Sequence, residues 1–93
     1  MFLYVVAYDL PCDKRRKKVS DLLEGYGCRV QYSVFECQLT PAKIKELRKR
    51  LSKVIKLDED SVRFYPLSQH TLGQVEIMGI GPPVISPPTS MII

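Results

Sequence analysis

The sequence predicts one α+β domain whose elements follow the order strand, helix, strand, strand, helix, strand. A fully apolar run opens the chain, and two later segments repeat apolar residues every third or fourth position. Short runs rich in β-branched and aromatic residues lie between and after those segments. This order is the split βαβ, or ferredoxin-like, pattern, in which both helices cover one face of a four-stranded antiparallel sheet.

The first half of the chain accounts for one helix and three strands. Residues 2–8 (FLYVVAY) are apolar at every position, as in a strand buried on both faces. Asp13 is expected to cap the helix that follows, and Gly25 and Gly27 are expected to end it. Residues 28–39 predict two short strands joined by a bend at residues 31–33. The helix presents one apolar stripe, formed by Val19, Leu22, Leu23 and Tyr26.

The second half of the chain accounts for the other helix and the remaining strands. Thr40 is the predicted cap of this helix, with Pro41 in its first turn. Residues 62–67 predict the fourth strand, and Pro66 within it indicates a sheet edge. Residues 75–80 predict a short extra C-terminal strand. The inner stripe of the helix is formed by Ile44, Leu47, Leu51, Val54 and Ile55.

These elements place the ferredoxin-like domain at residues 1–80. Residues 81–93 (GPPVISPPTSMII) hold four prolines and no charged residue. Such a composition predicts an extended, poorly ordered C-terminal tail.

The first strand is apolar on both faces, although the helices of this fold cover only one face of the sheet. A monomer would expose the other apolar face to water, which is unfavourable for a soluble protein. A second subunit packed sheet to sheet would cover it, with residues 75–80 added to the edge of the partner's sheet. We therefore expect a two-fold homodimer packed through the sheets.

The composition narrows the protein class. Apolar residues make up 45% and charged residues 26% of the 93 residues, as in ordinary globular proteins. No signal peptide or membrane span is recognisable, which predicts a cytoplasmic protein without membrane contact.

The three cysteines lack CxxC spacing, which argues against a zinc site and a disulfide framework, and Cys28 and Cys37 are expected to be small buried residues. No P-loop, GxSxG or HExxH motif supports nucleotide hydrolysis, acyl transfer or zinc-dependent proteolysis.

Asp9, at the end of the first predicted strand, is the candidate metal ligand. If the strand ends approach the two-fold axis of a dimer, two copies of Asp9 face one another. Two carboxylates, phosphate oxygens and waters suit Mg²⁺ or another divalent cation. Such an ion polarises a phosphodiester and lowers the pKa of bound water. The alternative is that Asp9 only stabilises the turn that follows it.

The net charge of +4 is unevenly distributed, because twelve of the fourteen Lys and Arg fall in two segments. Arg15 and Arg16 lie at the edges of the first apolar stripe, where either can grip a phosphate or pair with a carboxylate. Cations at a helix N-terminus oppose the helix dipole, so a bound anion would relieve a local cost. The basic segment 43–56 would track phosphate backbones, or only confer solubility. The candidate RNA or DNA contacts of the first segment are Lys14, Arg15, Arg16, Lys17 and Lys18.

Arg29 and Phe35 flank the bend between the second and third strands. Phe35 could stack on an unpaired base, or belong to the core or to a dimer interface. Tyr8, next to Asp9, leaves the same alternatives open.

Four segments in this order resemble the CRISPR-associated Cas-two family, over roughly residues 2–80: YVVAYDL, DKRRKKV, YGCRVQYSVFEC and DSVRFYPL. The resemblance implies a ferredoxin-like homodimer with a divalent-metal aspartate at Asp9 and Tyr8 beside it. Family members are described as metal-dependent nucleases on single-stranded RNA or on double-stranded DNA. Positions linked to activity in the family fall on Arg16, Lys18, Arg29 and Phe35.

The resemblance also implies a partner, the larger Cas-one integrase of spacer acquisition. In that complex the small dimer bridges two integrase dimers and helps to hold the DNA to be inserted. Two functions therefore remain open. The first is a Mg²⁺-dependent endonuclease built on paired Asp9 residues. The second is a non-catalytic structural adaptor that positions DNA for the integrase. A toxin-like ribonuclease of a sister family is a further alternative.

Overall fold

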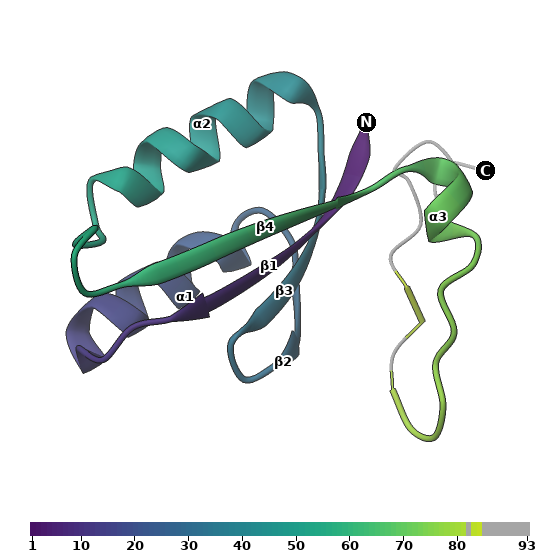
Figure 1. The fold of residues 1–93 in the computed structure, drawn as a ribbon, viewed down its shortest axis with the longest axis horizontal. Coiled ribbons are helices and arrows are strands. Elements are labelled where there is room, and N and C mark those ends of the chain that lie inside the picture. Colours follow the sequence, from purple (N-terminus) through teal and green to yellow (C-terminus); the bar gives the residue numbers. More distant parts are fainter. Residues whose placement is uncertain (82, 85–93) are drawn as a thin grey trace.

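The computed structural model describes residues 1–81, 83 and 84, and these form the predicted α+β arrangement (Figure 1). The strands are β1 (Phe2–Asp9), β2 (Cys28–Gln31), β3 (Val34–Leu39) and β4 (Ser61–Leu67). The helices are α1 (Asp13–Glu24), α2 (Pro41–Ser52) and a single turn, α3 (Gln69–Leu72). None of the described helices is long and apolar enough to cross a membrane.

The sheet has the order β2-β3-β1-β4, and every neighbouring pair is antiparallel. β1 is a central strand, with Val6 opposite Phe35 on one side and opposite Phe64 on the other. β4 is an edge strand, which explains how it accommodates Pro66, a residue without a backbone N–H. The strand order and directions are those of the predicted ferredoxin-like fold.

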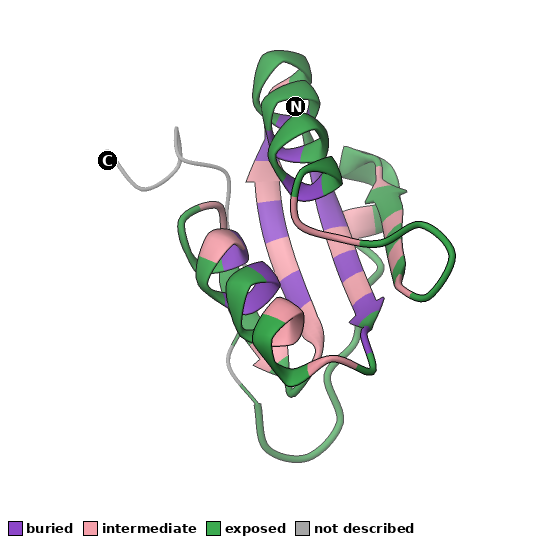
Figure 2. Cartoon of the chain, turned by 90° about the vertical axis from the view of Figure 1, so that its left-hand side faces the viewer, coloured by how far each residue is buried: buried purple, intermediate pink, exposed green. Residues whose placement is uncertain are grey.

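The core lies between one face of the sheet and the two long helices (Figure 2). β1 alternates between this core face and the opposite face, which we call the open face. Tyr4, Val6 and Tyr8 point into the core, while Val5 and Ala7 on the open face are half-buried. The core also contains, from β3 and the two helices, Val19, Leu23, Phe35, Cys37, Leu39, Ile44, Leu47 and Leu51.

Both helices begin and end close to the predicted residues, with two differences at their ends. The hydroxyl of Thr40 accepts a hydrogen bond from the backbone N–H of Lys43 at 3.2 Å, which confirms it as the cap of α2. The cap of α1 is Cys12 rather than Asp13, because the carboxylate of Asp13 is bound to Arg16. The helical stripe ends at Leu51, and the next apolar pair, residues 54–55, packs against the core from the turn after α2.

The cysteine prediction holds for one of its two residues. Cys37 is fully buried, and burial raises the pKa of its thiol to about 12. Cys28 is exposed instead of buried. Its partner in the register is Glu36, so it lies on the open face of the edge strand β2, where no helix covers it.

The segment after β4 differs most from the prediction. Residues 69–72 form the helical turn α3, capped by the hydroxyl of Ser68, between the fourth strand and the segment predicted as an extra strand. Residues 75–80 pair with no strand of the described chain, so the extra strand is absent here. The prediction assigned its pairing partner to a second subunit, and an isolated chain offers no such edge. The predicted 81–93 tail lies almost wholly outside the described residues.

A substitution at Gly27 tests how closely the start of β2 approaches β3. A Cβ at this position would lie 2.8 Å from Cys37 Cα and 2.6 Å from Cys37 Sγ. We expect Gly27→Ala to lower the free energy of unfolding by ~1–3 kcal/mol, because the backbone of a buried strand must move. Urea denaturation measures this change. Gly25→Ala is the matched control: its Cβ would lie 3.4 Å from Leu22 O, and a change under ~1 kcal/mol is expected. Equal stabilities of the two variants would contradict the close approach.

Candidate nucleic-acid site at the end of the central strand

A hollow of about 390 Å³ opens at the C-terminal end of β1. Asp9 is the last residue of this strand, is exposed, and pairs with Ser61 of β4. Because side chains alternate along β1, Asp9 shares the open face with Val5 and Ala7. The residues that line the hollow are Tyr8, Asp9, Leu10, Arg16, Tyr32 and Ser33. Three predicted site residues, Tyr8, Asp9 and Arg16, are thus brought together.

Arg16 is held beside this hollow by the chain that leaves β1. Its Nε and Nη2 atoms donate to the carbonyl oxygen of Leu10 at 3.1 and 2.8 Å. Its Nη1 atom pairs with Oδ1 of Asp13 at 2.6 Å, and this contact raises the pKa of Arg16 above its ordinary value. The guanidinium therefore stays charged and fixes the turn next to Asp9, and 29% of its side chain is accessible to a ligand.

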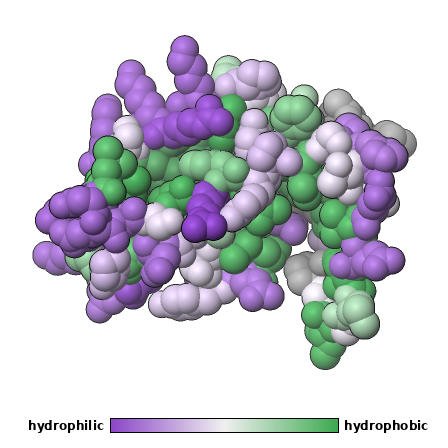
Figure 3. Space-filling view, viewed as in Figure 1, coloured by the Kyte–Doolittle hydropathy of each residue, from purple (hydrophilic) through white to green (hydrophobic). Residues whose placement is uncertain are grey.

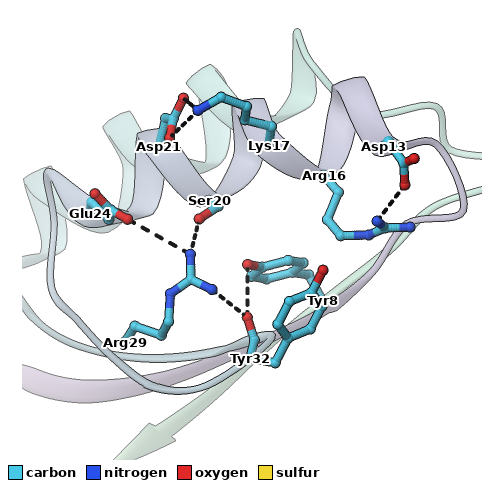
Figure 4. Close-up of a pocket in the computed structure, with 9 residues that line it drawn as sticks. All are labelled: Tyr8, Asp13, Arg16, Lys17, Ser20, Asp21, Glu24, Arg29 and Tyr32. Carbon is cyan, nitrogen blue, oxygen red and sulfur yellow. Dashed lines mark hydrogen bonds and ion pairs between the residues drawn. The ribbon is translucent and has the colours of Figure 1, made fainter.

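A second hollow, of about 360 Å³, adjoins the first on the helix-covered side of the sheet (Figure 4). Tyr8, Arg16 and Tyr32 line both hollows. The Tyr8 side chain is buried, and its hydroxyl donates to the carbonyl oxygen of Tyr32 at 3.4 Å. The remaining lining residues come from α1 and β2: Asp13, Lys17, Ser20, Asp21, Glu24 and Arg29.

Arg29 lines this second hollow and contacts several groups around it, although its side chain is 38% exposed. It donates to the carbonyl oxygen of Tyr32 at 2.9 Å and to the hydroxyl of Ser20, and lies 3.7 Å from Glu24 Oε1. Its guanidinium carbon also lies 5.2 Å from the ring centre of Phe35, a cation–π distance. Arg29 therefore braces the β2–β3 turn against α1.

Phe35 belongs to the core. Its side chain is 0% exposed, between Tyr8 and the guanidinium of Arg29, and it has no surface on which a base could stack. Of the alternatives left open by the sequence, the core position is the one observed. Any influence of Phe35 on a ligand passes through Arg29 and Tyr8, which it supports.

Arg15, the other arginine of the helix start, is used inside the fold. Its Nε and Nη2 atoms bind the two carboxylate oxygens of Asp60 at 2.7 and 3.0 Å, and Nη2 also lies 3.2 Å from Glu59. The Asp60 side chain is 0% exposed and accepts a further hydrogen bond from the backbone N–H of Lys56. Arg15 thus ties α1 to the turn before β4, and Arg16 is the arginine that faces the strand-end hollow.

The lysines of α1 lie on its outer surface. Lys14, Lys17 and Lys18 are exposed, and Lys17 pairs with Asp21 at 3.1 Å. Lys14 and Lys18 make no ion pair within the described part of the chain, and Lys18 lines neither hollow. The cations of segment 43–56 are also exposed, and Figure 3 shows hydrophilic side chains projecting along α2. Two basic surfaces therefore flank the sheet on the helix side.

A metal ion would find few ligands in one chain. Across residues 1–81, 83 and 84, no three His, Cys, Asp or Glu side chains gather closely enough to hold one. The exposed carboxylate of Asp9 is a suitable oxygen ligand for a hard cation, but it needs donors from elsewhere. The donor set fits Mg²⁺ only if a second carboxylate, a substrate phosphate and waters complete it.

Two residues of the site were not selected from the sequence. Ser20 follows a run of basic residues and carries no sequence signal of its own, because its contact with Arg29 depends on how α1 packs against β2. Tyr32 lies in the predicted bend. The sequence signal that could have identified it is an aromatic residue in a turn, outside both apolar runs.

The fold and the site define a small ferredoxin-like α+β protein in which one exposed carboxylate ends the central strand beside a basic helix. A family model described as CRISPR associated protein Cas2 matches residues 1–75. The chain belongs to this Cas2 family.

Two relatives show how far the similarity extends. The CRISPR-associated endoribonuclease Cas2 3 of Synechocystis sp. is 64% identical over 93 residues, covering 100% of both chains. The CRISPR-associated endonuclease Cas2 2 of Thermus thermophilus is 49% identical over 80 residues, covering 86% of this chain and 84% of the relative.

Solved structures agree with the fold. The hypothetical protein TT1823 from Thermus thermophilus superposes with a TM-score of 0.79 at 48% identity, covering 87% of this chain and 94% of that one. A chain of a partial Cas6-RT-Cas1–Cas2 complex superposes with a TM-score of 0.75 at 38% identity, covering 84% and 91%.

The Arg15–Asp60 pair predicts a specific acid sensitivity. The hydrogen bonds from Arg15 hold the pKa of Asp60 below its usual value of 3.8. Because the folded pKa is depressed, the stabilisation is complete above pH 3.8 and is lost as pH falls through the folded value. We expect Asp60→Asn to lower the melting temperature at pH 7, with the deficit shrinking below pH 3.8. Calorimetry from pH 2 to 7 measures this, and the exposed Asp58→Asn is the control. A deficit that is constant with pH would contradict this role of the pair.

Proposed function

We propose that this protein acts in CRISPR adaptation as a metal-dependent endonuclease on RNA or DNA, with Asp9 as its metal ligand. The observation that carries the proposal is the strand-end hollow, where the exposed carboxylate of Asp9 lies with the charged guanidinium of Arg16. A carboxylate that can hold a metal and a cation that can bind a phosphate are two groups that metal-dependent phosphodiester cleavage uses. The endoribonuclease and endonuclease names of the relatives support this activity.

A second copy of the chain would complete the metal site. Asp9 lies on the open face, where Val5 and Ala7 are only half-buried and Tyr65 is 46% exposed. Burying this apolar surface favours face-to-face pairing of two sheets. A two-fold axis near the ends of the two β1 strands would bring both Asp9 carboxylates to one Mg²⁺. When bound, that ion would polarise the phosphodiester and lower the pKa of a bound water.

The remaining residues have separable roles in this proposal. Arg16 stabilises negative charge on the phosphate, and Phe35 supports Tyr8 and Arg29 from the core. Arg29 holds the β2–β3 turn in position against α1. Lys18, on the outer face of α1, extends the path of the nucleic-acid backbone, together with Lys14 and Lys17.

A second candidate is a non-catalytic adaptor that holds DNA for a Cas1 integrase. The solved Cas1–Cas2 complex that contains a similar chain favours it. So does the exposed basic surface of α2, whose cations suit contacts with a phosphate backbone. Both functions can reside in one protein, because Asp9 and the α2 surface do not overlap. The similarity to Cas2 relatives over the full chain favours either function over a toxin-like ribonuclease.

Replacing Asp9 tests the endonuclease. We expect Asp9→Ala, or addition of a chelator, to slow cleavage by roughly 10²-fold or more, because activated-water catalysis is lost. Wild type and variant are purified in parallel and assayed on RNA and on duplex DNA, with and without Mg²⁺. Asp58→Ala, an exposed acid outside both hollows, is the matched control and should cleave at the wild-type rate. Undiminished cleavage by Asp9→Ala would reject the site.

Charge reversal on α2 tests the adaptor. Lys45, Lys49 and Lys53 are exposed and make no ion pair within the described part of the chain. Their combined change to Glu should weaken duplex binding and flatten the dependence of log K on log salt by ~0.9 for each phosphate that the variant no longer neutralises. Spacer insertion with the integrase should fail in this variant and survive in Asp9→Ala. An unchanged salt slope would show that α2 does not contact DNA.

A further inference from the structure

The β2–β3 turn places an exposed aromatic ring where the two hollows meet. Tyr32 is 73% exposed, against 46% for Tyr65 and 45% for Phe2. It lines both the strand-end hollow with Asp9 and the second hollow with Arg29. Because Phe35 and Tyr8 are buried, Tyr32 is the aromatic residue of this site that can present a ring face to a ligand.

The backbone of this exposed residue is firmly held. The carbonyl oxygen of Tyr32 accepts hydrogen bonds from Arg29 at 2.9 Å and from the Tyr8 hydroxyl at 3.4 Å. The next carbonyl, of Ser33, accepts from the backbone N–H of Tyr8 at 3.1 Å. The turn is thereby attached to both β1 and β2, so presenting the ring costs little conformational entropy.

The charged groups around the Tyr32 ring are suited to the phosphate of a nucleotide whose base stacks on the ring. In Figure 4 the Tyr32 ring extends from the turn toward Arg16 on α1. Tyr32 and Arg16 both line the strand-end hollow and the second hollow, so the phenol and the guanidinium share one site. A base stacked on the ring would leave its phosphate close to a fixed positive charge and to the carboxylate of Asp9.

We propose that Tyr32 is a specificity-determining residue that stacks on an unpaired base and thereby selects single-stranded nucleic acid at the Asp9 site. This inference rests on the proposed function, because it assigns a substrate class to the same hollow. Bases within a duplex are already paired and stacked, so they are unavailable to the ring unless the helix is opened. Duplex binding through the lysines of α1 and α2 requires no such contact.

The test measures binding rather than cleavage. All variants carry Asp9→Asn and are studied with a chelator, so the result is independent of catalysis. The probe is a single-stranded oligonucleotide with one 2-aminopurine, compared with the same sequence as a duplex. Tyr32→Ala should weaken single-strand binding about tenfold, the usual effect of removing one aromatic side chain that stacks on a base. Duplex binding should be unchanged. The variant should also abolish the quenching of 2-aminopurine fluorescence, which reports stacking directly.

Tyr32→Phe keeps the ring without the hydroxyl and should retain both the affinity and the quenching. Circular dichroism should show the same fold for all variants, because Tyr32 is exposed. Three results would overturn the inference: full single-strand affinity in Tyr32→Ala, equal losses in the Ala and Phe variants, or equal losses on single strand and duplex. Cleavage that persists in Asp9→Ala would reject the nuclease while leaving this binding result intact.

Discussion

The two-residue period of the central strand β1 is the constraint on which the rest of the structure depends. Alternation buries Tyr4, Val6 and Tyr8 under the helices, and turns Val5, Ala7 and Asp9 to the open face. A shift of one residue would bury the carboxylate and expose the aromatic rings. The register is fixed on both sides, with Val6 opposite Phe35 and Phe64. The same pattern that builds the core therefore places a single carboxylate at the end of the central strand, on the open face.

Three arginines around the site also stabilise the structure, and each binds a different group. Arg15 pairs with a carboxylate that has no exposed surface, Arg16 binds carbonyl oxygens of the turn after β1, and Arg29 binds the β2–β3 turn. Each uses several donors of a planar guanidinium, which a lysine could not replace. Arg16 alone also faces the hollow that holds Asp9. The basic run in the sequence thus contains, in adjacent positions, an arginine that binds a buried carboxylate and one that lines the hollow with Asp9.

Local patterns predicted most of the fold, whereas contacts between distant segments had to be observed. The apolar run of β1, the stripe of the first helix and the Thr40 cap depend on neighbouring residues and are confirmed, as is the stripe of the second helix up to Leu51. Whether Arg15 or Arg16 meets the site depends on Asp60, which lies 45 residues from Arg15. The burial of Phe35, the exposure of Cys28 and the position of Tyr32 likewise follow from packing. Residues 75–80 had the composition of a strand, but strand formation requires an available edge.

The position of β1 in the sheet has a consequence for how the chain is made. β1 leaves the ribosome before β3 and β4 and pairs with both of them, and β4 ends at Leu67. Until β4 emerges, one side of the apolar β1 has unsatisfied hydrogen-bonding groups and is prone to association with other chains. Such non-local pairing slows folding, because a long loop must close before the contacts form. Newly made chains should therefore be most prone to association with other chains until β4 has been synthesised.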